Sequence, residues 1–68
     1  MKIGEAVKLS MARNRCITLP EFEGILKIKP TDGPENCVVM RTDSSHPSKH
    51  GWQPSAKDLI REDWVVTE

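Results

Sequence analysis

Aromatic residues are scarce in this chain. Its 68 residues include no tyrosine, one phenylalanine (Phe22) and two tryptophans (Trp52 and Trp64). Large aromatic side chains dominate the burial of small domains. Each of the three rings is therefore expected to be either an anchor of the core or part of a binding surface.

Long apolar runs and dense clusters of one charge sign are also missing. No stretch approaches the roughly 20 apolar residues of a membrane span, and the start lacks the apolar run of a secretory signal peptide. The net charge is zero: residues 1–29 carry six Lys/Arg against three Glu, a balance of +3, and residues 30–68 carry four against seven acidic residues, a balance of −3. No basic cluster suits a nucleic acid polymer. We expect a cytoplasmic protein with neither membrane nor nucleic acid partners.

Metal-binding and catalytic motifs are weakly represented. Structural zinc sites usually bring cysteines in close pairs, whereas Cys16 and Cys37 stand far apart on predicted strands and are expected to be free thiols. His46 and His50 lie in a serine-rich stretch and are read as solvated. There is no glycine-rich phosphate loop, and no third group completes a Cys/His nucleophile pair. The sequence therefore predicts no metal, no cofactor and no enzyme.

The length indicates one domain, residues 1–68, near the lower limit for burying a self-sufficient core. Chains of this size often gain stability from a staple or from self-association. Residues 2–13 predict an amphipathic helix that ends at Asn14, with one side formed by Ile3, Ala6, Val7, Ser10 and Met11. Strands are expected at 16–19, 25–29 and 37–42, the last being the most buried.

Turns and loops separate these strands. A turn at 22–24 uses the positive φ that Gly24 allows, and a second turn covers 31–36. Residues 43–50 are expected to form a polar, mobile loop.

The region 51–68 contains the clearest start and stop signals. Ser55 is placed to cap a short helix, Asp58 completes a capping box, and Pro54 fixes the entry. Leu59 and Ile60 are expected on the core side of this helix, and a strand follows from Trp64. The chain therefore predicts an α+β fold, a small antiparallel sheet with an N-terminal amphipathic helix and a short C-terminal helix before the last strand.

A binding site can be built from the same residues. The N-terminus of the helix at Ser55 presents N–H groups that suit an anion, and Trp52, three residues earlier, is placed to stack on a purine or a ribose. Phe22 is the other candidate platform. The alternative is that both rings only close the core, and the residues alone favour that alternative.

Several motifs resemble one family of small phage and prophage proteins. The pattern Trp52-x-Pro54-Ser55-x-x-Asp58-Leu59-x-x-Glu62-Asp63-Trp64 resembles the C-terminal signature of the Thoeris anti-defence proteins of the second type. The start Met1-Lys2-Ile3-Gly4-Glu5-Ala6-Val7 looks like that family's opening, with Ile3 where Phe is common. Residues 17–24 align without a gap with a family strand that often runs Val-Ala-Arg-Lys-Gly-Trp-Asn-Gly.

The resemblance implies a non-enzymatic sponge. Family members bind the cyclic ADP-ribose-type signal of a bacterial immune sensor in the host cytoplasm and hold it intact, so that the defence effector stays inactive. Some relatives also take cyclic dinucleotides. The family assembles as a homotetramer with ligand pockets between protomers, which agrees with the expectation that so short a chain self-associates.

By matched position the resemblance suggests six ligand-binding residues. These are Phe22, Gly24, Trp52, Pro54, Ser55 and Asp58. Our hypothesis is that Phe22 or Trp52 stacks on a base while the helix start at Ser55 meets pyrophosphate. Two departures put the ligand's identity in question, because Leu19 replaces a basic residue and Phe22 replaces Trp. The rival hypothesis is a phage or prophage protein–protein interaction module with no nucleotide ligand, and a nucleotide hydrolase ranks below both.

Overall fold

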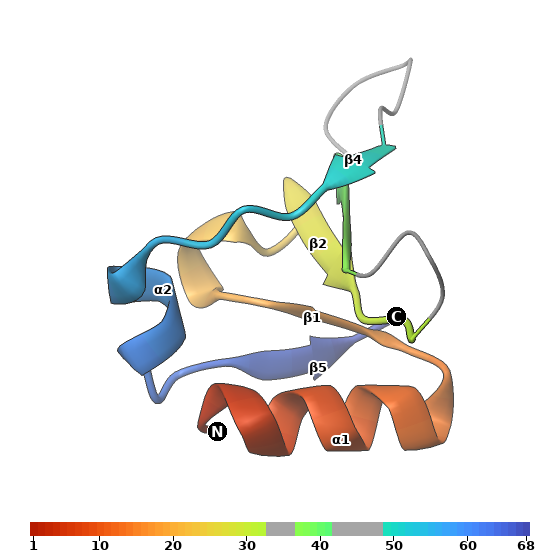
Figure 1. Cartoon of the computed structure of the whole chain (residues 1–68), viewed down its shortest axis with the longest axis horizontal. Helices are drawn as coiled ribbons and strands as arrows, with labels where there is room; N and C mark the ends of the chain where they lie inside the picture. The colour runs from red at the N-terminus through yellow and green to blue at the C-terminus, as the bar shows by residue number, and fades with distance from the viewer. Residues whose placement is uncertain (33–36, 42–48) are drawn as a thin grey trace.

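The computed structural model describes residues 1–32, 37–41 and 49–68. As predicted, the fold is α+β, with an N-terminal helix, an antiparallel sheet and a short helix before the last strand (Figure 1). The described strands form one sheet in the order β4-β3-β2-β1-β5. They are β1 (Cys16–Thr18), β2 (Leu26–Lys29), β3 (Val38–Arg41), β4 (Lys49–Gly51) and β5 (Val65–Thr67).

Helix α1 (Ile3–Arg13) packs against β1 and β5. Its buried positions are Ala6 and Ser10, and Ile3 and Val7 complete the apolar side as predicted. Met11 was expected on this side but is 41% exposed. Successive helical residues are about 100° apart, so Met11 is turned away from the line through Ser10 that faces the sheet.

The end of α1 follows from its backbone geometry. Asn14 takes the left-handed conformation (φ 53°), as expected for a helix stop. Its N–H donates to the Met11 carbonyl, and the Arg15 N–H donates to the Ser10 carbonyl at 2.8 Å. These bonds satisfy carbonyls of the last turn and redirect the chain into β1.

One face of the sheet carries the core. Ile17 of β1 pairs with both Val66 of β5 and Ile28 of β2, and Ile28 pairs with Val39 of β3. Directly paired residues of antiparallel strands point to the same face, so these side chains form a continuous apolar row. Ala6 of α1 packs against the row and shares its core cluster.

The prediction that residues 37–42 form the most buried strand was wrong, because β1 holds that place in the described sheet. All three residues of β1 are buried, whereas in β3 only Val38 and Val39 are. Strand β1 lies between β2 and β5 and is also covered by α1. Composition favoured 37–42, but β3 also lies between two strands, so the cover that α1 gives to β1 is what distinguishes the two.

A 3₁₀-helix, η1 (Pro20–Phe22), follows β1 and the buried Leu19. The Phe22 N–H donates to the Leu19 carbonyl at 2.9 Å. Gly24 then turns the chain into β2 with φ 81°, which confirms the predicted use of a positive φ. An added Cβ at Gly24 would meet no atom within 4 Å, so only the backbone conformation calls for glycine.

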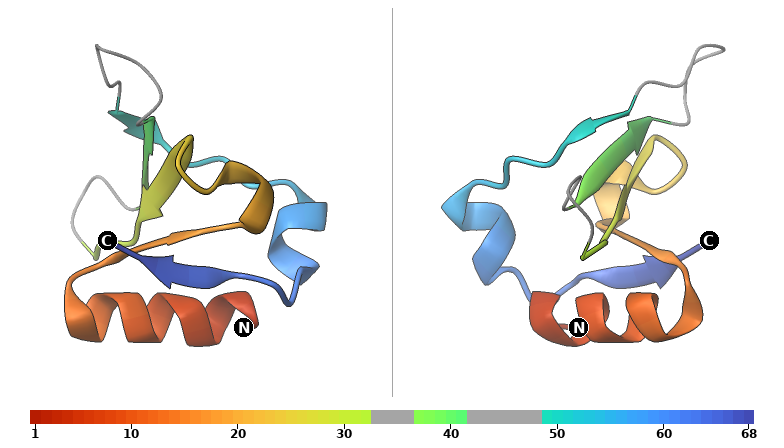
Figure 2. Two further views of the ribbon diagram at one scale, coloured as in Figure 1. Left: turned by 180° about the vertical axis from the view of Figure 1, so that it is seen from behind. Right: turned by 45° about the vertical axis from the view of Figure 1, so that its right-hand side comes forward.

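The predicted capping box is present at helix α2 (Ala56–Ile60). The Asp58 N–H donates to Ser55 Oγ at 3.3 Å, and the Ser55 N–H donates to Asp58 Oδ2 at 3.1 Å. Figure 2 shows an extended segment that carries the chain from β4, at one edge of the sheet, to α2.

The expectation that Leu59 and Ile60 belong to the core was wrong. Leu59 is 46% exposed and Ile60 is 77% exposed. Helix α2 has only five residues, and its backbone rather than an apolar face attaches it to the core: the Trp64 indole Nε1–H donates to the Asp58 carbonyl at 3.0 Å. Trp64 itself is 1% exposed, which confirms its assignment to the core.

Strand β4 was not predicted. Lys49 and His50 were assigned to the polar loop, but their backbone pairs with Met40 and Val39 of β3. An edge strand needs only backbone pairing, so its polar composition gave no signal. The predictions for residues 33–36 and 42–48, which include His46 and most of the mobile loop, lie outside the described residues.

Candidate functional site

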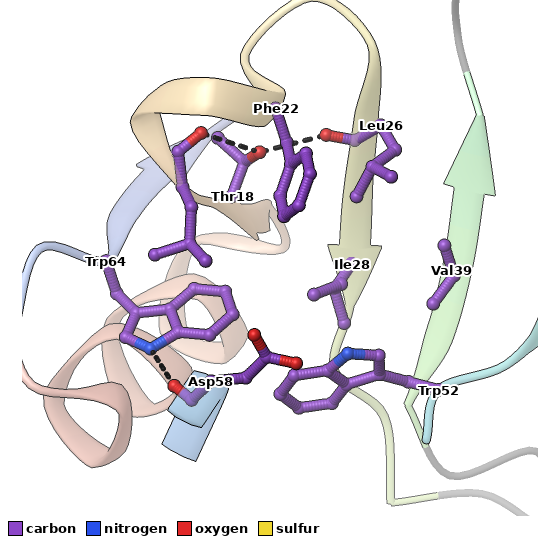
Figure 3. A pocket seen from close by; sticks show the side chains of 9 residues that line it. Thr18, Phe22, Leu26, Ile28, Val39, Trp52, Asp58 and Trp64 are labelled. Atoms are coloured by element: carbon purple, nitrogen blue, oxygen red, sulfur yellow. Dashed lines mark hydrogen bonds between the residues drawn. The ribbon is translucent and has the colours of Figure 1, made fainter. Parts of the chain in front are cut away.

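A small pocket lies on the core side of the sheet, near α2 (Figure 3). Its volume is about 130 Å³. The lining side chains come from β1, η1, β2, β3, α2 and the segments that flank α2. They are Thr18, Leu19, Phe22, Leu26, Ile28, Val39, Trp52, Asp58 and Trp64.

Three aromatic rings form much of the wall, and the backbone fixes each of them. Phe22 ends η1 and is half-buried. The Trp52 N–H donates to the Cys37 carbonyl at 2.9 Å, which ties this residue to the start of β3. Trp64 is held through its indole N–H on α2. The indoles of Trp52 and Trp64 meet edge to face, with centroids 5.7 Å apart and planes at 80°.

The polar groups of the pocket are few. Thr18 Oγ1 donates to the Leu26 carbonyl at 2.9 Å, so its hydroxyl proton is already used. The Asp58 carboxylate points into the pocket between the two indole rings (Figure 3). One of its oxygens accepts the Ser55 N–H, and the other has no hydrogen-bond partner among the described residues.

An arginine clamp holds η1 beside the pocket. Arg61, which follows α2, donates to both carboxylate oxygens of Glu21 in η1 and to both oxygens of Asp63. Hydrogen bonds from Arg61 hold the pKa of the Glu21 and Asp63 carboxyl groups below their usual values. The clamp joins the residue before Phe22 to the segment that leads into Trp64.

The structure brings together only part of the predicted site. Phe22, Trp52 and Asp58 line the pocket, whereas Gly24, Pro54 and Ser55 do not. Gly24 makes the turn after η1, and Ser55 is exposed and engaged in the cap.

Sequence reasoning missed several walls of the pocket. Trp64 was assigned to the core alone, although it also lines the pocket, and Leu26, Ile28 and Val39 were assigned only to strands. Two tryptophans on either side of a capped helix were the one available signal.

The pocket continues beyond Trp52. A second hollow of about 470 Å³ is lined by Val39, Gly51, Trp52 and Gln53. Trp52 and Val39 line both spaces. Trp52 is thus placed to contact a ligand that extends past the small pocket.

The described residues contain no group of three or more His, Cys, Asp or Glu side chains placed to hold a metal ion. Cys16 is buried and Cys37 half-buried, both as free thiols; the side chain of His50 is not described. Of the described helices, none has the length and apolar character needed to cross a membrane.

The fold and pocket define a small α+β domain that presents an aromatic pocket with one carboxylate. The chain belongs to the Thoeris anti-defence 2-like family: a family model described as Tad2-like, Thoeris anti-defense 2-like domain, matches residues 1–67. No curated protein and no solved structure shows a significant match to the chain. Membership supports an anti-defence role and is consistent with a non-enzymatic one.

Proposed function

We propose that this protein sequesters a cyclic nucleotide immune signal, a cyclic ADP-ribose isomer or a cyclic dinucleotide, and so keeps a bacterial anti-phage effector inactive. Family membership supports the anti-defence part of this proposal. The observation that carries the ligand class is the pocket walled by Phe22, Trp52 and Trp64. Flat aromatic rings stack on nucleobases, as in single-stranded nucleic acid complexes. The site of action is the bacterial host cytoplasm, where such a signal is made.

The size of the pocket indicates how the ligand is held. Pockets for drug-sized ligands measure roughly 300–1,000 Å³. The small pocket, about 130 Å³, holds only one ring system, so the rest of a cyclic nucleotide extends over Trp52 into the second hollow. Enclosing that exposed part calls for a second copy of the chain. We therefore include a homo-oligomer, a tetramer by analogy with the family, in the proposal.

Binding without chemistry fits the groups that line the pocket. None of the described residues that line it is a His, Cys or Lys, and the Thr18 hydroxyl donates to a backbone carbonyl instead of facing a general base. A nucleophile–base pair that could cleave a pyrophosphate is thus not assembled among these residues.

Ligand capture tests the proposal. Purified protein is mixed with a panel of cyclic ADP-ribose isomers and cyclic dinucleotides, separated from free ligand, and denatured by heat. Mass spectrometry of the released fraction should return the captured ligand unchanged. Altered mass would indicate a hydrolase. Failure to retain any panel member would favour the interaction module, for which the exposed Leu59 and Ile60 on α2 offer a surface.

Trp52→Ala gives a sharper version of this test. Stacking on one aromatic ring contributes on the order of 1–3 kcal/mol per base, so affinity for the captured ligand should fall about tenfold or more. Size-exclusion chromatography should show the wild-type oligomeric state. Leu59→Ala, an exposed apolar residue outside the pocket, serves as the matched control and should bind as the wild type does. Unchanged affinity in Trp52→Ala would remove Trp52 from the site.

A further inference from the structure

Two polar groups of the pocket have no partner in the described part of the chain. Asp58 Oδ2 accepts the Ser55 N–H at 3.1 Å, but Oδ1 accepts no hydrogen bond there. The Trp52 indole N–H likewise has no acceptor among the described residues. Figure 3 shows the carboxylate directed between the indoles of Trp52 and Trp64. The lining residues thus offer a ligand one free acceptor on Asp58 and one free donor on Trp52.

The charge of the pocket argues against a phosphate inside it. Asp58 is the only charged residue among the described residues that line it, and a carboxylate repels an anion more strongly where water is partly excluded. The nearby strand β2 carries Lys27 and Lys29, but these alternate with Ile28 and so point to the opposite face of the sheet. Lys27 Nζ donates to the Glu68 carbonyl and Lys29 Nζ to Asn14 Oδ1, both at 2.6 Å.

The helix start is no better as a phosphate site. The capping box uses the N–H groups of Ser55 and Asp58 and places a carboxylate at that end of the helix. The groups that remain suit an uncharged ring with an N–H donor.

We propose that the pocket receives the nucleobase of the sequestered ligand and that Asp58 Oδ1 accepts a hydrogen bond from an exocyclic amine of the adenine type, while the phosphates stay outside. A cavity of about 150 Å³ lined by apolar side chains admits one benzene ring, so a half-open space of similar size suits one base edge. Adenine offers an amine donor at its 6-position, and hypoxanthine offers a carbonyl acceptor there.

The test compares adenosine with inosine, which has a carbonyl in place of the 6-amine and an N–H in place of the acceptor nitrogen at ring position 1. The comparison therefore asks whether Asp58 Oδ1 is aligned with position 6 of the base. Trp52 and Trp64 are the only tryptophans and both line the pocket, so quenching of intrinsic fluorescence reports occupancy. Wild-type protein should bind adenosine about tenfold or more tightly than inosine, because hydrogen bonds to charged groups are among the stronger ones. Equal affinities, or no binding of either nucleoside at millimolar concentration, would overturn the proposal.

The substitution Asp58→Asn should change which of the two nucleosides the protein prefers. If the amide oxygen accepts the Ser55 N–H, the amide NH₂ faces the pocket and matches the inosine carbonyl, so the preference should vanish or reverse. Asp58→Glu keeps a capping-box residue but moves the carboxylate by one methylene, and it should also lose the preference. Glu62→Gln changes an exposed carboxylate outside both the pocket and the Arg61 clamp, and it should keep the preference. An unchanged adenosine-to-inosine ratio in both Asp58 variants would overturn the assignment.

The proposal rests on the proposed function for the nature of the full ligand, but the two can fail separately. If the protein prefers adenosine to inosine but captures no cyclic nucleotide, the sequestration hypothesis is refuted and the assignment of the pocket to a base stands. If the protein captures a cyclic nucleotide but the Asp58 variants leave the ratio of adenosine to inosine affinity unchanged, the sequestration hypothesis stands and the role of Asp58 is refuted.

Discussion

At the scale of single residues, two glycines should respond in opposite ways to the same substitution. Gly24 has φ 81°, a conformation that costs a residue with a Cβ roughly 1–2 kcal/mol, whereas Gly4 lies inside α1. Gly24→Ala should therefore destabilise the protein by about 1 kcal/mol, and Gly4→Ala should stabilise it by up to about 0.5–1 kcal/mol through helix propensity. An added Cβ meets no atom within 4 Å at either site, so the comparison isolates the backbone. Urea unfolding measures both, and destabilisation by Gly4→Ala or none by Gly24→Ala would contradict it.

At the scale of elements, the Arg61 clamp should make the attachment of η1 depend on pH. The pKa values of Glu21 and Asp63 are lowered in the folded chain from ordinary values of 4.5 and 3.8. A carboxyl group whose pKa is lower in the folded chain than in the unfolded chain stabilises the fold fully when the pH is above its unfolded pKa. This stabilisation is lost as the pH falls through the folded pKa. The free energy of unfolding should thus decline as pH falls below about 4.5. In Arg61→Ala, the free energy of unfolding should therefore fall less between pH 6 and pH 3 than it does in the wild type. Urea unfolding at both pH values measures this difference.

The control for the clamp is a second ion pair. Lys2 Nζ lies 3.9 Å from Glu62 Oε1, and both side chains are 72% exposed. Exposed pairs of this kind contribute about 0–1 kcal/mol, so Lys2→Ala should leave the pH dependence nearly as it is in the wild type. If Arg61→Ala kept the full decline, the clamp would not be its source.

At the scale of the whole molecule, the proposed self-association can be tested on the outer side of α1. A hollow of about 440 Å³ there is lined by Met1, Glu5, Lys8, Leu9 and Ala12. In an antiparallel pair related by a two-fold axis that crosses α1 midway between Glu5 and Lys8, Glu5 would face the partner's Lys8 and Lys8 would face the partner's Glu5. Among the described residues neither charge is paired within the chain. Glu5→Lys should reduce the oligomeric mass measured by light scattering. The double variant Glu5→Lys with Lys8→Glu should restore the wild-type mass. If Glu5→Lys alone assembled as the wild type does, this interface would be excluded.

The same scales explain what the sequence could predict. The stop at Asn14 and the capping box of Ser55 and Asp58 depend on a few neighbouring residues, so they could be predicted from the sequence. The exposure of Ile60 and the burial of β1 depend on where α2 and α1 pack in the fold, which no local pattern encodes. Phe22, Trp52 and Asp58 were identified from residue chemistry and the family motif. The remaining walls of the pocket come from separate strands, and only the folded chain brings them together.

The place of β5 beside β1 has a consequence for the order of events during synthesis. The backbones of Cys16 and Thr67 pair across fifty intervening positions, and Trp64 is buried in the core. Such distant pairing slows folding, because the entropy cost of closing a long loop comes before the contacts that offset it. A nascent chain that lacks residues 64–67 has neither the strand that pairs with β1 nor the Trp64 wall of the pocket. Folding and completion of the pocket are therefore expected together, in one late step after the ribosome has released this segment.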